Sequence, residues 1–164
     1  MAESNRQYRV GLGYDLHRTI AGRPLVLANI VIPHEKGLDG HSDADVVIHA
    51  LIDAITGAAG LPDIGEMFPN TDAKYKGMDS AEFLKATMER FAATGWRIVN
   101  VDIVVLAQRP KLMPYKGAMM KRLAELMKVD ESQVNIKGKT GEGVDAVGEE
   151  RAMGCHCVVL VERD

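Results

Sequence analysis

Two short stretches of this 164-residue chain carry side chains that can bind a metal ion. Asp15 and His17 alternate within one extended segment, so their side chains point to the same face. His41 and His49 bracket the start of an expected helix. Two imidazoles and one carboxylate suit Zn²⁺ with an open position for substrate. The types and spacing therefore favour a metal site, although an Asp-x-His pair or a lone helix histidine is more often structural.

The expected helix carries two further acids on the side of His49. Asp45, His49 and Asp53 follow one another at steps of four, so they share one stripe. We expect Asp53 to accept a hydrogen bond from the second ring nitrogen of His49 and to fix the ring's orientation. We expect Asp45 to accept a hydrogen bond from a substrate hydroxyl and to orient it in the same way. The alternative is that all three form an ordinary solvated helix face.

Glycine-containing segments raise the question of phosphate binding. The run 138–143 follows a short apolar stretch and offers a phosphate its backbone N–H groups, Lys139 and Thr140, although such runs are more often plain turns. The cationic side chains of residues 107–113 either bind another phosphate or belong to a solvated turn. The pair Gly11 and Gly13 lacks the third glycine and the following helix of a dinucleotide-binding loop, which excludes that function.

The only two cysteines, Cys155 and Cys157, flank His156 in an expected strand. Both sulfurs would face one way and the imidazole the other, so buried core cysteines are favoured over a metal cluster. Two residues apart, they do not easily bridge each other, which is typical of the reducing cytoplasm.

Strands and helices that alternate along the chain must position these side chains. Alternating apolar residues predict strands over 8–14, 25–32, 96–107, 134–139 and 155–161. Helices are expected from Asp43 to Gly60, from Asp79 to Gly95, and after Pro114. Ser42 is the predicted N-cap of the first helix, with Asp45 three residues on, and 63–76 reads as a loop.

This alternation predicts an α/β fold of the α+β sandwich type. We expect one mixed, mainly four-stranded sheet with helices packed on one face. Residues 1–7 are predicted to be a flexible tail, and 8–164 a single catalytic domain. The chain is 46% hydrophobic and 26% charged, which is typical of a globular domain.

The charge and hydropathy patterns exclude some partners. A net charge of −3 argues against nucleic acid. No apolar run approaches the roughly 18 residues of a membrane span. The polar first nine residues lack the apolar centre of a signal peptide. We therefore expect a cytoplasmic protein without a nucleic-acid or membrane partner.

Taken in order, these motifs resemble the 2-C-methyl-D-erythritol 2,4-cyclodiphosphate synthase family of the non-mevalonate isoprenoid pathway. The resemblance runs from about Tyr8 to Glu162. Several motifs in the right order are more specific than any one of them. The motifs are 13–17, 41–45 with His49 and Asp53, 63–65, 68–72, 76–80 and 107–111.

The resemblance implies a homotrimer with active sites between subunits. It also implies a phosphorus–oxygen lyase that cyclises 4-diphosphocytidyl-2-C-methyl-D-erythritol 2-phosphate to the 2,4-cyclodiphosphate and releases CMP. A divalent metal, usually zinc, is implied at Asp15, His17 and His49. Glu142 is implied as ligand of a second metal, Mg²⁺ or Mn²⁺, that bridges the phosphates.

The resemblance also implies the substrate contacts. His41 and Thr140 match catalytic positions; His41 and Ser42 lie at the diphosphate. Asp63 and Gly65 hold the methylerythritol, and 107–113 takes the cytidine of the adjacent subunit. The full set of implied substrate-binding residues, with Lys139 added as a hypothesis, is Asp15, His17, His41, Ser42, Asp63, Ile64, Gly65, Phe68, Asp72, Ala107, Lys111, Leu112, Met113, Lys139, Thr140 and Glu142.

The segment 139–149 departs from the family. Many bacterial members have Thr-Thr-Thr-Glu followed by an aromatic residue and an arginine, whereas this chain has Lys139-Thr140-Gly141-Glu142 with Ala146 and Glu149 at the later positions. Those two contacts are not expected here, and Lys139 is predicted to supply positive charge instead. Two alternatives stay open: a zinc-dependent phosphoesterase, and a non-catalytic trimeric sensor of a nucleotide or isoprenoid.

Overall fold

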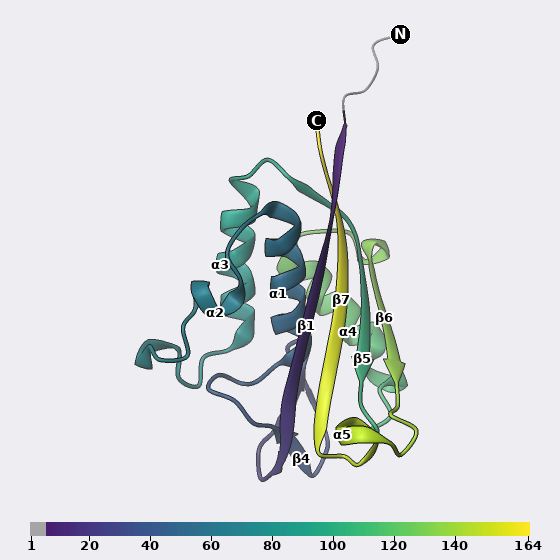
Figure 1. Cartoon of the computed structure of the whole chain (residues 1–164). Helices are drawn as coiled ribbons and strands as arrows, with labels where there is room; N and C mark the ends of the chain where they lie inside the picture. Colours follow the sequence, from purple (N-terminus) through teal and green to yellow (C-terminus); the bar gives the residue numbers. More distant parts are fainter. Residues whose placement is uncertain (1–5) are drawn as a thin grey trace.

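A computed structural model describes residues 6–164 and contains a five-stranded sheet in the order β4-β1-β7-β5-β6 (Figure 1). Neighbouring strands are antiparallel except for the parallel pair β5 and β6. The predicted mixed sheet is therefore confirmed, with one short strand added to four longer ones. The strands are β1 (Gln7–Ala21), β4 (Lys36–Leu38), β5 (Arg97–Leu106), β6 (Val134–Lys139) and β7 (Ala152–Arg163).

Helices cover one face of this sheet, as predicted. Helix α1 packs against β1 and β7, α3 packs against α1, and α4 packs against β6 and α3 (Figure 1). The region expected to be a loop, 63–76, contains α2 and a 3₁₀ turn over Ala73–Tyr75. The helices are α1 (Val46–Ala59), α2 (Ile64–Met67), α3 (Ser80–Ala92), α4 (Lys116–Met127) and α5 (Asp145–Gly148).

The predicted flexible tail over 1–7 lies largely outside the described residues. Its last residue, Gln7, is already paired with Arg163 at the start of β1. Strand β1 is also longer than predicted, because the antiparallel ladder with β7 continues through Arg18. The polar residues beyond Tyr14 are those of the metal motif, which break the apolar alternation without ending the strand.

The two faces of the sheet differ sharply in exposure. Cys155 and Cys157 are fully buried under the helices, while His156 between them is exposed, as predicted. Burial raises the pKa of both thiols, and both cysteines are free. On the opposite face, the large apolar residues Val10 and Leu12 of β1 are 65% and 66% exposed. The helix-covered face is therefore the core, and the other face is open.

Gly11 and Gly13 have a packing role. A Cβ added at Gly13 would lie 1.8 Å from the carbonyl oxygen of Ala50, and one at Gly11 would lie 1.8 Å from that of Ala54. Such separations are far inside van der Waals contact, so only glycine lets β1 approach α1 this closely. The pair therefore fixes how near the strand carrying Asp15 and His17 lies to the helix carrying His49.

Residues 25–32 form a hairpin, and the prediction of one continuous strand was wrong. Strands β2 (Leu25–Leu27) and β3 (Ile30–Ile32) pair antiparallel across a two-residue turn. Ala28 and Asn29 have φ values of 54° and 60°, the left-handed conformation that such turns require. Ala28 extends the apolar run and hides the turn in the sequence.

The N-cap of α1 is Asp45, and the prediction of Ser42 was wrong. The Asp45 carboxylate accepts hydrogen bonds from the N–H groups of Val47 and Ile48, at 3.1 and 3.2 Å. It also accepts from the N–H groups of Ala28 and Asn29 in the hairpin turn, at 3.0 and 2.6 Å. Because Asp45 is fully buried in these contacts, the prediction that it binds a substrate hydroxyl was wrong as well.

Replacing Asp45 with asparagine is expected to destabilise the fold and to change its pH dependence. The amide would place a donor against a backbone N–H, and an unpaired buried donor costs about 1–3 kcal/mol. Burial raises the pKa of Asp45 to about 6 from its ordinary value of 3.8, so between these pH values the native state binds more protons than the unfolded state. Stability from this group is therefore fully present below about pH 4 and lost as pH rises through 6. Urea unfolding from pH 4 to 7 should show a steeper loss of stability with rising pH in the parent than in Asp45→Asn, and equal slopes would contradict the assignment.

Candidate metal centre and substrate pocket

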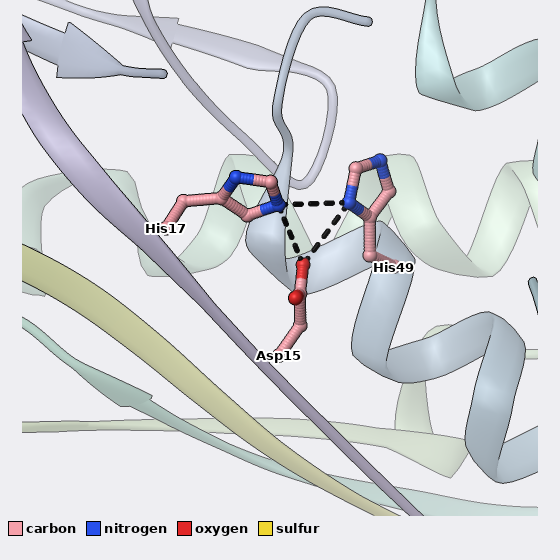
Figure 2. Close-up of side chains that lie close together, drawn as sticks. All are labelled: Asp15, His17 and His49. Atoms are coloured by element: carbon pink, nitrogen blue, oxygen red, sulfur yellow. Dashed lines mark hydrogen bonds and ion pairs between the residues drawn. The ribbon is translucent and has the colours of Figure 1, made fainter. Parts of the chain in front are cut away.

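Asp15 and His17 from β1 and His49 from α1 converge on one point (Figure 2). Asp15 Oδ2 lies 2.9 Å from His17 Nε2 and 3.0 Å from His49 Nδ1. The two ring nitrogens are 3.3 Å apart. Ligands at about 2.0–2.1 Å from a tetrahedral zinc ion lie roughly 3.3 Å from one another. The donor set and its spacing therefore fit a divalent metal with one further position open to substrate.

The charges of this centre also suit a cation. Burial alone would raise the pKa of Asp15, but hydrogen bonds from His17 and His49 hold it well below its usual value. Burial alone would lower the pKa of His17, yet the Asp15 carboxylate and the Asp39 carbonyl raise it. Asp15 is thus an anion held against two imidazoles, and the positive charge that it stabilises there can be supplied by a bound metal ion.

The loop before α1 fixes the His17 ring. His17 Nδ1 lies 2.7 Å from the carbonyl oxygen of Asp39, to which it donates, so Nε2 is left to face Asp15. Arg23 holds the same loop by donating to the carbonyl oxygens of Gly40 and Ser42, at 2.9 and 2.7 Å. Sequence reasoning missed Arg23, because no local pattern connects it with a loop about 17 residues later.

The prediction that Asp53 orients His49 was wrong. Asp53 Oδ1 instead accepts a hydrogen bond from the Ile64 N–H at 2.9 Å and so holds the start of α2. Burial raises the pKa of Asp53. The second ring nitrogen of His49, Nε2, faces the N-terminus of α3, where it lies 3.0 Å from Ser80 Oγ.

A cavity of about 560 Å³ opens beside the metal centre. His17 and His49 form part of its wall, so the centre faces the cavity directly. Ser42 is mostly buried, and its Oγ accepts from the Ala44 N–H and lies 3.4 Å from His49 Nε2. The remaining lining residues are Gly40, His41, Ile64, Gly65, Phe68, Pro69, Asn70, Thr71, Tyr75 and Phe83.

Two acids implied in substrate binding, Asp63 and Asp72, adjoin the lining residues Ile64 and Thr71 in the sequence and act as caps. Asp63 accepts from the Glu66 N–H at 2.9 Å and begins α2. Asp72 accepts from the Lys74 N–H at 3.1 Å and begins the 3₁₀ turn. The local folds of the cavity wall therefore depend on the same carboxylates that the resemblance places at the substrate.

The other implied substrate residues form a second group away from this cavity. The Ala107 N–H donates to the Lys139 carbonyl at 2.9 Å, and Thr140 Oγ1 donates to Glu142 Oε1 at 2.7 Å. A separate hollow is lined by His34, Glu35 and residues 108–111. The metal-side cavity and the hollow beside residues 108–111 are therefore lined by different residues of the chain.

A larger hollow, of about 820 Å³, lies between α3, α4 and the start of β5. It is lined by apolar residues such as Met88 and Trp96 with charged residues of both signs at its edge. Among the residues that the structure describes, Asp15, His17 and His49 are the one group of at least three side chains close enough to bind a metal ion together. His17 and His49 therefore border the cavity of about 560 Å³ and not this larger hollow.

Known proteins resemble the chain over almost its whole length. A protein from Desulfosudis oleivorans named 2-C-methyl-D-erythritol 2,4-cyclodiphosphate synthase is 51% identical over 153 residues, which cover 93% of this chain and 91% of that protein. The solved bifunctional IspDF of Campylobacter jejuni superposes with a TM-score of 0.94 at 39% identity; the match covers 98% of this chain and 43% of that one. The CDP complex of IspF from Plasmodium falciparum gives a TM-score of 0.83 at 34% identity, covering 94% and 95%. The model of the YgbB family matches residues 8–162, and the chain therefore belongs to the YgbB family.

Proposed function

We propose that this chain is a 2-C-methyl-D-erythritol 2,4-cyclodiphosphate synthase, a phosphorus–oxygen lyase of the non-mevalonate pathway. Its substrate is 4-diphosphocytidyl-2-C-methyl-D-erythritol 2-phosphate, and its products are the 2,4-cyclodiphosphate and CMP. The observation that carries the proposal is the Asp15–His17–His49 centre in the wall of a cavity of about 560 Å³. The names of the relatives, together with the CDP in one of the similar structures, support the same reaction.

The reaction needs positioning and charge neutralisation from the protein. The 2-phosphate of the substrate attacks the β-phosphorus, the bond to the CMP oxygen breaks, and no protein nucleophile is required. Asp15, His17 and His49 would hold a divalent ion, usually zinc, which when bound would supply positive charge to the phosphoryl oxygens. His41 and Ser42 hold the diphosphate, and Asp63 and Gly65 hold the methylerythritol. Ile64, Phe68 and Asp72 are further substrate-binding residues. Fixing both phosphates in attack geometry is the main contribution that a protein can make to such a transfer.

The site is completed by a second copy of the chain in a homotrimer. The cytidine segment 107–113, including Ala107, Lys111, Leu112 and Met113, is absent from the lining of the metal-side cavity. The open sheet face exposes Tyr8, Val10, Leu12, Tyr14, Leu16 and Val158, an apolar area that a monomer seldom leaves uncovered. Sedimentation of the protein is expected to give a mass three times the 17.9 kDa of the chain.

The segment beside β6 serves the leaving group. Lys139 supplies positive charge and Thr140 stabilises the transition state, while Glu142 would hold the Mg²⁺ or Mn²⁺ that neutralises the diphosphate. The Thr140–Glu142 hydrogen bond at 2.7 Å supports this by keeping the two side chains together. Unchanged kinetics in Lys139→Ala would remove that residue from the mechanism.

We assign residues 8–164 to one catalytic domain and place the protein in the cytoplasm. The two buried, free cysteines are compatible with a reducing compartment. In the described part of the chain, none of the helices combines the length and the apolar character that crossing a membrane would require.

The test is incubation of the purified protein with the cytidyl substrate and either Zn²⁺ with Mg²⁺ or a chelator. A synthase releases CMP and the cyclic diphosphate in equal amounts, and only with metal present. A phosphoesterase would instead give a linear phosphate. A sensor would bind the nucleotide without turnover. Either of these last two results would overturn the proposal.

A further inference from the structure

A chain of three side chains runs from the metal centre to the N-terminus of α3. His49 Nε2, the nitrogen that faces away from Asp15, lies 3.0 Å from Ser80 Oγ. Ser80 Oγ in turn donates a hydrogen bond to Asp43 Oδ1, and the Ser80 N–H donates to Asp43 Oδ2 at 2.9 Å. Ser80 is fully buried, and 13% of the His49 side chain is exposed.

The direction of these hydrogen bonds follows from the number of protons. An ionised carboxylate only accepts, so the single Ser80 hydroxyl proton points to Asp43. The Ser80 oxygen then offers His49 only a lone pair, and Nε2 must carry a proton in order to donate to it. In a neutral imidazole the other nitrogen, Nδ1, is then unprotonated and free to bind a metal.

Asp15 acts on His49 in the opposite sense when no metal is bound. Its Oδ2 lies 3.0 Å from Nδ1 and would accept a proton there. A ring with its proton on Nδ1 cannot bind a metal through that nitrogen until the proton has moved. Asp15 therefore favours the Nδ1–H tautomer of His49, whereas Ser80 favours the Nε2–H tautomer.

We propose that Asp43 and Ser80 are positioning residues that hold the proton of His49 on Nε2 and so present Nδ1 to the metal. Ser80 acts on the ring directly, and Asp43 acts through Ser80. Outer partners of this kind typically change metal affinity by about 10–100-fold when they are removed. The inference concerns the metal centre alone and holds whichever reaction the centre catalyses.

His17 supplies an internal control. Its tautomer is fixed by the backbone carbonyl of Asp39, at 2.7 Å from Nδ1. This contact shares no atom with Ser80 or Asp43. A change at Ser80 that acts through the proposed chain should therefore alter His49 and leave His17 as it was, whereas general damage to the centre should alter both rings.

The experiment is nitrogen-15 NMR of the metal-free protein labelled at histidine, at a pH where both rings are neutral. The two-bond couplings report which nitrogen of each ring carries the proton. We expect Nε2–H at His49 in the parent and a shift to Nδ1–H in Ser80→Ala, with His17 unchanged. Asp43→Asn should shift His49 in the same direction, because it frees the Ser80 hydroxyl to donate to Nε2. The zinc dissociation constant, measured with a competing chelator, should rise about 10–100-fold in both variants.

Ser42→Ala is the matched control, since Ser42 Oγ lies 3.4 Å from the same ring nitrogen. It should keep Nε2–H at His49. Nδ1–H in the parent would overturn the proposal without any variant, even if Ser80→Ala failed to fold. An unchanged His49 tautomer in Ser80→Ala, or equal changes at His17 and His49, would also overturn it.

Discussion

His49→Ala is expected to abolish turnover and to weaken zinc binding by more than about 100-fold. Removing an outer partner of a metal ligand already reduces affinity by about 10–100-fold, and loss of a ligand reduces it further. His49 supplies the nitrogen 3.0 Å from Asp15 and 3.3 Å from His17 Nε2, so its loss leaves two ligands. Zinc titration with a competing chelator, alongside CMP release, measures both effects.

His156→Ala is the matched control for metal binding. His156 is an exposed imidazole on the opposite face of the sheet, beside Tyr14 with ring centroids 4.7 Å apart and the two rings tilted by 33°. The zinc affinity of the His156→Ala variant should equal that of the parent protein. If His49→Ala bound zinc as tightly as the parent, the metal would have to lie elsewhere in the protein.

Gly13→Ala is expected to destabilise the protein by about 3 kcal/mol or more and to weaken metal binding with it. The new Cβ would lie 1.8 Å from the Ala50 carbonyl oxygen, so β1 and α1 must separate. Overpacking of a tight core typically costs about 1–3 kcal/mol, and here the obstacle is backbone that cannot rotate away. Because Asp15 and His17 lie on β1 and His49 on α1, the same separation pulls the metal ligands apart. Chemical unfolding and zinc titration check the two effects.

Gly57→Ala tests whether the effect belongs to the contact with β1. Gly57 lies in α1, the helix that contains Ala50, and nothing lies within 4 Å of a Cβ placed there. This substitution should be neutral or stabilise by about 0.5–1 kcal/mol, because alanine favours the helix over glycine. A similar loss of stability in both variants would show that α1 tolerates no substitution of this kind and would refute the close-approach explanation.

The metal centre was largely predictable because its three ligands follow simple periodicities. Asp15 and His17 share a face through the two-residue repeat of a strand, and His49 lies on the first turns of a strongly patterned helix. What the sequence does not contain is the contact that orients each ring. The partner of His17 is a backbone carbonyl, and the partner of His49 is Ser80 from another helix, 31 residues away.

The error in the predicted cap of α1 has a similar cause. Both Ser42 and Asp45 are good N-caps by type. Asp45 is the N-cap in the structure because the hairpin turn brings two extra N–H groups, those of Ala28 and Asn29, to its carboxylate. That hairpin was itself missed, since Ala28 conceals the turn within an apolar run. The separation of the cavity from residues 107–113 is likewise a property of the folded chain that no local pattern reveals.

The most direct test of the proposed reaction is to run it in water enriched in oxygen-18 and to weigh the products by mass spectrometry. Attack by the substrate's own 2-phosphate predicts CMP and a cyclic diphosphate that both lack oxygen-18. Attack by water at the metal centre would instead yield a linear product with one oxygen-18 in its phosphate, and that result would contradict the synthase.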